Sequence, residues 1–304
     1  MLYPDFNDLI AYKAKKNAFK HSSKRCVKSS AAGNHHSPFR GRGLEFDSVR
    51  QYVPGDDIRC IDWRVTARTG LPHLKLFREE RERQILLCVD MNATMRFGTQ
   101  NTFKSVQAAH AASFLGWRGL EQHHCVSACL FGDVLRGVQV FPSKNTGKSF
   151  CTVLKTFTQP CREEHSISIY ESLQHIDRVS RTGSLIYLIS DFMDLDGILH
   201  NNALLSRLNK RCDVIFIAIN DRSDQSILPV GTLGFCIDQT NKMFINTDSI
   251  AGREAYTHLW NQNRQQLYGI TAKFKIPLIE LTTESDIQRD LALGLKSIVK
   301  RMRQ

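Results

Sequence analysis

Three short runs of consecutive apolar residues divide the chain: Ile85–Val89, Leu185–Ile189 and Val214–Ile219. A strand that is apolar on both of its faces is typical of a parallel sheet covered on both sides. Between the first two runs, apolar residues recur at helical spacing from Phe103 to Trp117. The alternation of buried strands with helices predicts an α/β fold, with helices on both faces of the sheet.

The same pattern predicts further elements around these three strands. The additional expected strands are Cys125–Phe131, Leu135–Phe141, Gly234–Asp238, Met243–Asn246 and Pro277–Leu281. The expected helices are Ser149–Phe157, Ser168–Val179, Ile198–Leu208, Gly252–Tyr268 and a C-terminal helix that carries Ile287 to Ile298.

The first 80 residues have a different pattern. Phe6 to Ile10 favour a short helix, which is followed by polar, basic and Ser-rich sequence typical of a loop. Glycines and prolines then separate two expected strands, Leu44–Val53 and Leu74–Phe77. We therefore divide the chain into a basic flexible arm with a short helix (1–37), a β-rich elaboration (38–80) and an α/β domain (81–304).

The charge is concentrated in the arm. The formal net charge is +11, from 41 Lys and Arg against 30 Asp and Glu. Residues 9–44 contain nine basic residues and no acidic ones, so the rest of the chain is nearly neutral. The arm is interpreted as a solvated tail, a phosphate-binding segment or a site for an acidic protein. Nucleic acid is disfavoured because the arm lacks the interleaved aromatic residues of single-strand binders.

Composition and cysteine usage narrow the class of protein. A hydrophobic content of 42% with 23% charged residues excludes a mostly disordered, collagenous or fibrous chain. No apolar run approaches the roughly 20 residues of a membrane-spanning helix. The nine cysteines are scattered and form no Cys-x-x-Cys pair, which favours a reduced compartment. We expect a soluble, cytoplasmic protein.

Polar residues follow two of the predicted strands. Asp90, Asn92 and Thr94 alternate with apolar residues after the first strand, and Asp191 follows the strand 185–189. Sites in open α/β sheets form beyond the carboxyl ends of the strands, where these side chains would meet. Such oxygen ligands suit a divalent cation, and Mg²⁺ is the expected ion. The alternative is that these residues close turns and cap helices.

The chain also resembles a known family. The segments that carry the resemblance are Gly41–Phe46, Arg50–Asp57, Ile61–Trp63, Glu80-Arg81, Val89–Gly98 and Ile189–Phe192. They are similar to the signature of the MoxR-associated family called domain of unknown function 58. The likeness is good over roughly residues 38–200. It implies a von Willebrand A-like (Rossmann-like) fold, with a mostly parallel sheet flanked by helices.

Domains of that fold often carry a metal-ion-dependent adhesion site. Its pattern is Asp-x-Ser-x-Ser, a later Thr and an Asp after a central strand. The resemblance assigns Asp90, Asn92 and Thr94 to the first element, Ser166 to the later Thr, with Ser168 close behind, and Asp191 to the last. The departure is Asn92, which stands where the pattern has Ser. A functional site would leave one coordination position open for a carboxylate of the partner.

Other motifs are weaker. Gly147-Lys148-Ser149 lacks the first glycine of a phosphate-binding loop, because that position is Pro142. Asp56, Asp57 and Asp62 could serve acid–base chemistry, but they lie in strong turn sequence, which favours a structural role.

Three functions follow from these observations. The leading one is a non-enzymatic interaction module: the resemblance implies a partner of a MoxR-type AAA+ ATPase and its client protein in assembly or maturation. The second is a metal-dependent hydrolase, such as a phosphoesterase, that uses Asp90 and Asp191. The third is a nucleic-acid binder that acts through the basic arm.

Overall fold

The structure is a computed structural model that describes residues 3–14, 44–79, 82–132, 137–159, 167–236 and 242–301. The chain forms two compact units, Met1–Lys28 with Arg83–Gln304, and Ser29–Glu82. The first is named the main unit and the second the signature unit. Most of the basic arm lies outside the described residues.

The main unit is built on a sheet with the strand order β10-β7-β6-β3-β4-β5. Neighbouring strands run parallel, except that the edge strand β5 is antiparallel to β4. The strands are β3 (Gln84–Asp90), β4 (Cys125–Gly132), β5 (Gly137–Lys144), β6 (Leu185–Ser190), β7 (Asp213–Asn220) and β10 (Leu278–Thr282). The expected α/β fold with a mostly parallel sheet is confirmed.

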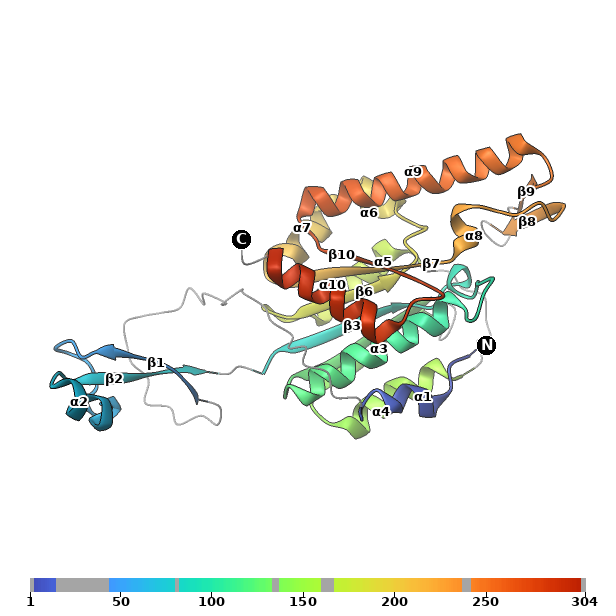
Figure 1. Cartoon of the computed structure of the whole chain (residues 1–304). Coiled ribbons are helices and arrows are strands. Elements are labelled where there is room, and N and C mark those ends of the chain that lie inside the picture. The colour runs from blue at the N-terminus through green and yellow to red at the C-terminus, as the bar shows by residue number, and fades with distance from the viewer. Residues whose placement is uncertain are drawn as a thin grey trace. The chain divides into compact units, whose positions relative to one another are not determined.

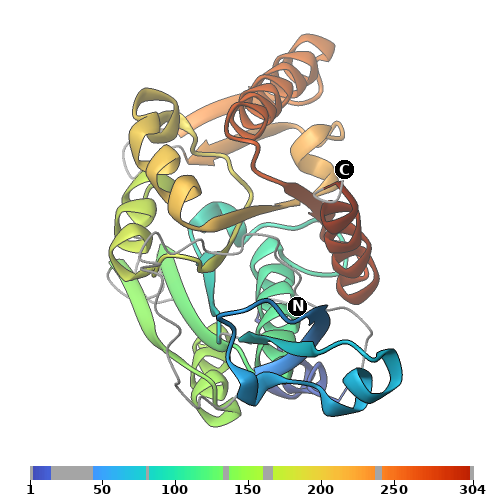
Figure 2. The same cartoon turned by 90° about the vertical axis from the view of Figure 1, so that its left-hand side faces the viewer.

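Helices cover both faces of this sheet (Figures 1 and 2). One face carries α1 (Phe6–Ala11), α3 (Lys104–Glu121), α4 (Gly147–Phe157) and α10 (Ile287–Arg301). The other carries α5 (Ile169–Val179), α6 (Asp196–His200), α7 (Asn202–Arg211) and α9 (Ile250–Phe274). The short helices η2 (Ala93–Met95) and α8 (Arg222–Gln225) follow β3 and β7.

The two layers of core follow from the alternation of side chains along the strands. On β3, Leu87 packs with the α3 layer and Leu86 with the α5 layer. All seven residues of β3 are buried, as the continuous apolar run predicts. The predicted helix 198–208 is wrong in one respect, because it is two helices that meet at Asn201.

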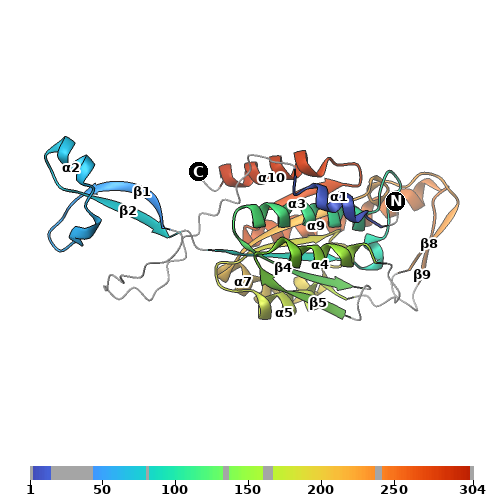
Figure 3. The ribbon, with the colours of Figure 1, turned by 90° about the horizontal axis from the view of Figure 1, so that it is seen from below.

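The first helix belongs to the main unit. In α1, the Leu9 side chain is fully buried, and α1 lies against α3 and α4 (Figure 3). The Leu9 carbonyl accepts hydrogen bonds from Ser113 Oγ (2.6 Å) and Trp117 Nε1 (3.1 Å). Asp5 caps the helix by accepting from the Asn7 amide. The predicted short helix is therefore present, and it is anchored in the core.

The signature unit is an antiparallel pair, β1 (Leu44–Gln51) with β2 (His73–Glu79). The connection between them holds the short helix η1 (Ile58–Cys60) and the helix α2 (Trp63–Thr69). The sequence pattern predicts the two strands, whereas it does not predict α2.

A further antiparallel pair among the described residues is β8 (Thr232–Cys236) with β9 (Lys242–Asn246), which precedes α9. No helix among the described residues is long and apolar enough to cross a bilayer.

Candidate functional site at the carboxyl edge of the sheet

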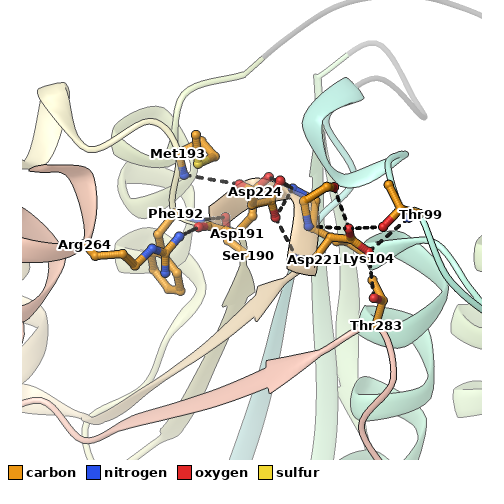
Figure 4. Close-up of polar contacts among 11 residues, drawn as sticks. Thr99, Lys104, Ser190, Asp191, Phe192, Met193, Asp221, Asp224, Arg264 and Thr283 are labelled. Carbon is orange, nitrogen blue, oxygen red and sulfur yellow. Dashed lines mark hydrogen bonds and ion pairs between the residues drawn. The ribbon is translucent and has the colours of Figure 1, made fainter. Parts of the chain in front are cut away.

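The candidate site is formed by residues that follow three neighbouring parallel strands (Figure 4). Asp90 ends β3, Asp191 follows β6, and Asp221 and Asp224 follow β7. Lys104, the first residue of α3, reaches them from the helix that follows β3. The parallel topology thus brings four carboxylates and an ammonium group to one edge of the sheet.

Lys104 is the buried centre of this cluster, with a side chain only 2% exposed. Its Nζ donates to Asp191 Oδ2 at 2.9 Å and to both carboxylate oxygens of Asp224 at 3.2 and 3.3 Å. The Phe97 ring lies 5.8 Å from the same nitrogen. Burial acts to lower the pKa of Lys104, but the carboxylates of Asp191 and Asp224 outweigh it and raise the pKa. The ammonium group is therefore charged throughout the physiological pH range.

Asp90 is held by two donors from its own edge. Its Oδ1 accepts from the Asn92 amide at 2.9 Å, and its Oδ2 accepts from Ser190 Oγ at 2.6 Å. Burial and the nearby carboxylate of Asp191 raise the pKa of Asp90 to about 7, although these hydrogen bonds and Lys104 lower it.

The Asn92 side chain is hydrogen-bonded to the neighbouring loop. Its Nδ2 donates to the Ile167 carbonyl at 2.9 Å, and its Oδ1 accepts from the Ile167 amide at 3.0 Å. The side chain therefore closes a two-bond pair with one backbone residue. Gly132, at φ +105°, allows this close approach: a Cβ there would lie 2.6 Å from the Asn92 amide nitrogen and 2.7 Å from its Oδ1.

Asp221 connects three loops through its carboxylate. It accepts from the backbone and hydroxyl of Thr99, from the backbone and hydroxyl of Ser223, and from the Thr283 hydroxyl. Burial acts to raise the pKa of Asp221, but the hydrogen bonds from Ser223 and Thr99 dominate and lower it. A carboxylate with this many donors fixes the loops after β3, β7 and β10.

The segment after β6 is held in an unusual conformation. Phe192 has φ 54° although its side chain is fully buried, and its amide donates to Ser190 Oγ at 3.0 Å. A bulky residue in the left-handed region stores roughly 1–3 kcal/mol of strain. The guanidinium group of Arg264, from α9, donates to the Asp191 carbonyl and holds this turn on the side opposite Lys104 (Figure 4).

The five residues predicted as metal ligands have different positions. Asp90, Asn92 and Asp191 lie at the edge, and all three are buried. Thr94 is exposed in η2, and Ser166 lies outside the described residues. Ser168, the neighbouring alternative, caps α5 by accepting from the Glu171 amide at 3.1 Å.

The side-chain oxygens that would bind a metal at this edge, in their present arrangement, do not fit a divalent cation. Each side-chain oxygen of Asp90, Asn92 and Asp191 already accepts a hydrogen bond. For Asp191 Oδ1 the donor is the Met193 amide. The Lys104 ammonium lies among the same carboxylates and would repel a divalent ion placed there. The bound Mg²⁺ therefore stays a prediction from the sequence.

Sequence reasoning missed Lys104, Asp221 and Asp224. The signal for the two aspartates was present in the sequence, because they follow β7 just as Asp191 follows β6. Lys104 gave no such signal, since a lysine at the start of a helix is ordinarily solvated.

Asp56, Asp57 and Asp62, the candidates for acid–base chemistry, lie in the signature unit. Asp57 and Asp62 cap η1 and α2, and Asp56 accepts from the Val53 amide and pairs with Arg50 at 2.6 Å. The structural interpretation of these three aspartates is therefore confirmed.

Large apolar side chains are exposed on this unit. Among residues 48–75, whose side chains are described, only Leu74 is buried. Trp63 is 69% exposed, Ile58 62%, Val53 56% and Leu71 52%. We call these four residues the signature patch. Several large exposed apolar side chains on so small a unit are typical of an interaction surface.

Comparisons with known proteins place these features in a family. At 27% identity over 265 residues, the chain is similar to the uncharacterized proteins Mb1516 of Mycobacterium bovis and Rv1480 of Mycobacterium tuberculosis. The match covers 85% of this chain and 81% of either relative.

Solved structures with partial likeness include BatB from Bacteroides thetaiotaomicron and the SpRpn10 VWA domain. The first has a TM-score of 0.46 at 13% identity and covers 72% of this chain and 99% of its own. The second has a TM-score of 0.38 at 10% identity and covers 73% and 95%. The model of the family described as "Protein of unknown function DUF58" matches residues 48–266, which include the signature patch and the carboxyl edge. The chain belongs to this DUF58 family.

Proposed function

We propose that the chain is a non-enzymatic protein-interaction module that binds a MoxR-type AAA+ ATPase and presents it to a client protein. The observation that carries the proposal is the signature patch, four exposed apolar side chains on a unit with one described buried residue. A two-stranded unit of this size is marginally stable alone, so burial of the patch by a partner would stabilise it.

The charged residues near the signature patch indicate what kind of partner surface it would bind. The exposed arginines Arg59, Arg64 and Arg68 are interspersed with it in sequence. The neighbouring carboxylates of Asp57 and Asp62 point instead to the backbone amides that they cap. The three arginines outnumber these two carboxylates, so this segment favours an acidic partner surface, and binding should weaken as salt is added.

The test uses the purified full chain and a purified MoxR-type ATPase from the same organism. Trp63→Ser should weaken binding by about tenfold or more, because exposed tryptophans at interfaces are frequent hot spots. Leu228→Ser is the matched control, since Leu228 is 76% exposed in the main unit. Equal binding by wild type and Trp63→Ser, or no binding by wild type, would refute the proposal.

The alternative hydrolase has less support at this edge. A phosphoesterase that uses Asp90 and Asp191 needs a metal, and their oxygens already bind Ser190, Lys104 and backbone amides. A chromogenic phosphoester assay with Mg²⁺ or Mn²⁺ separates the two. Metal-dependent turnover that Asp90→Ala abolishes would favour the hydrolase.

A further inference from the structure

The carboxyl edge of the sheet holds its own positive charge. The Lys104 ammonium lies among Asp191 and Asp224, with Nζ–oxygen distances of 2.9 to 3.3 Å. Both carboxylates come from loops that follow neighbouring parallel strands, β6 and β7. A single cation therefore joins the ends of two strands to the first turn of α3.

This arrangement has the electrostatic role of a bound metal ion. A cation between carboxylates offsets their mutual repulsion and the cost of burying them. Without Lys104, Asp191 and Asp224 would be buried acids next to Asp90 and would lack this ammonium partner; Arg264 donates to the Asp191 carbonyl and not to a carboxylate oxygen. The cluster therefore needs a cation, and the chain supplies one covalently.

We propose that the Lys104 ammonium is the resident cation of this edge and takes the place of a divalent ion. The edge is then ordered without metal. Its cation also differs from a metal in one respect that bears on recognition. Its three N–H groups are matched by three oxygens, one of Asp191 and two of Asp224, and the Phe97 ring lies 5.8 Å away, so it offers no open position to a carboxylate from a partner.

The inference is independent of the ATPase proposal, which rests on the signature unit. It can be tested on the isolated full chain by thermal unfolding and by Mn²⁺ binding, with no partner present. Failure of this test would leave the signature patch untouched, and failure of ATPase binding would leave Lys104 untouched.

The first measurement uses wild type. Its Tm should be the same in EDTA, in millimolar Mg²⁺ and in millimolar Mn²⁺. Electron paramagnetic resonance should detect no Mn²⁺ at the edge. A bound Mn²⁺ signal or a rise in Tm that Asp191→Asn abolishes would overturn the proposal, whatever the variants below do.

The second measurement removes the ammonium. Lys104→Ala should have a lower Tm in EDTA, and Mn²⁺ should then raise that Tm by roughly 5 °C or more at a hundredfold excess over the dissociation constant. Lys148→Ala, at an exposed lysine of α4, is the matched control and should show neither change.

Two further results are decisive for the variant. A Lys104→Ala protein as stable as wild type in EDTA would refute the role of the ammonium. If Lys104→Ala is insoluble without added cation, refolding in Mn²⁺ and in EDTA becomes the readout. Recovery of folded protein in Mn²⁺ alone supports the proposal, and equal recovery in both contradicts it.

Discussion

Asn92→Ser changes the residue that departs from the adhesion-site pattern, and the structure predicts that this change is destabilising. Asn92 is buried, and its amide group makes two hydrogen bonds with the Ile167 backbone, at 2.9 and 3.0 Å. A serine hydroxyl is too short to bridge both the amide and the carbonyl of Ile167. The Asn92 backbone bond to Asp90 would remain, because it does not involve the side chain.

The magnitude follows from these two bonds. Each contributes about 0.5–1.5 kcal/mol, and a buried group left without a partner costs about 1–3 kcal/mol. Ile167 is half-buried, so water replaces part of the loss. We expect Asn92→Ser to lower the free energy of unfolding by about 2–3 kcal/mol. For a chain of this size, that lowers Tm by roughly 5 °C or more.

The assay is urea unfolding, monitored by circular dichroism. Asn145→Ser, at an exposed position before α4, is the matched control and should change the free energy by less than about 0.5 kcal/mol. If the two variants are equally stable, the Asn92–Ile167 pair does not hold this loop. Since Lys104 is unchanged in Asn92→Ser, its Tm should also remain insensitive to Mg²⁺, even though serine restores the pattern.

Three other substitutions test the core and the loops of the main unit. Leu9→Ala should cost about 2–5 kcal/mol in urea unfolding, as for other fully buried leucines; a loss under about 1 kcal/mol would show that α1 is not part of the core. Gly132→Ala should cost about 1–3 kcal/mol, because its φ is +105° and a Cβ would meet Asn92; wild-type stability would contradict this contact. The folded-state pKa of Asp221 is lowered, so its contribution to the free energy of unfolding is fully present above the unfolded pKa of about 3.9. This contribution declines below that pH and is lost as pH falls through the folded-state pKa. Between pH 5 and pH 3, Asp221→Asn should therefore lose less stability than wild type, and an equal loss would count against the hydrogen-bonded carboxylate.

Much of the main unit could be predicted from the sequence. Ile85–Val89, Leu185–Ile189 and Val214–Ile219 lie in β3, β6 and β7, because a continuous apolar run fits a strand that is covered on both faces. The helix α2 could not be predicted in this way. Its sequence from Trp63 to Thr69 has no apolar stripe to bury, and its start depends on the cap by Asp62.

The candidate site was predictable only in part. Asp90 and Asp191 could be identified because parallel topology brings the ends of β3 and β6 together. The burial of Lys104 depends on two carboxylates that are 87 and 120 residues away in sequence. Local pattern carries no information on such a partnership, so a lysine beside apolar helix residues is interpreted as solvated.

The buried cluster is better explained by specificity than by stability. A buried ion group often contributes little net free energy, because desolvation offsets the attraction between the charges. Lys104 nevertheless fixes a geometry: its bonds to Asp191 and Asp224 set the loops after β6 and β7 against α3. Asp221 binds Thr99 and Thr283 and adds the loops after β3 and β10.

A surface ordered in this way does not need an ion to be assembled. An adhesion site that depends on Mg²⁺ is lost on chelation, whereas loops held by a covalently attached ammonium group persist. If the edge takes part in binding the ATPase or its client, EDTA should leave that binding unchanged, and Lys104→Ala should weaken it. If EDTA treatment of this chain alone, before it is mixed with the Mg²⁺-loaded ATPase, abolishes binding, and Mg²⁺ restores it in wild type but not in Asp191→Asn, a metal lies at this edge and Lys104 is not its resident cation.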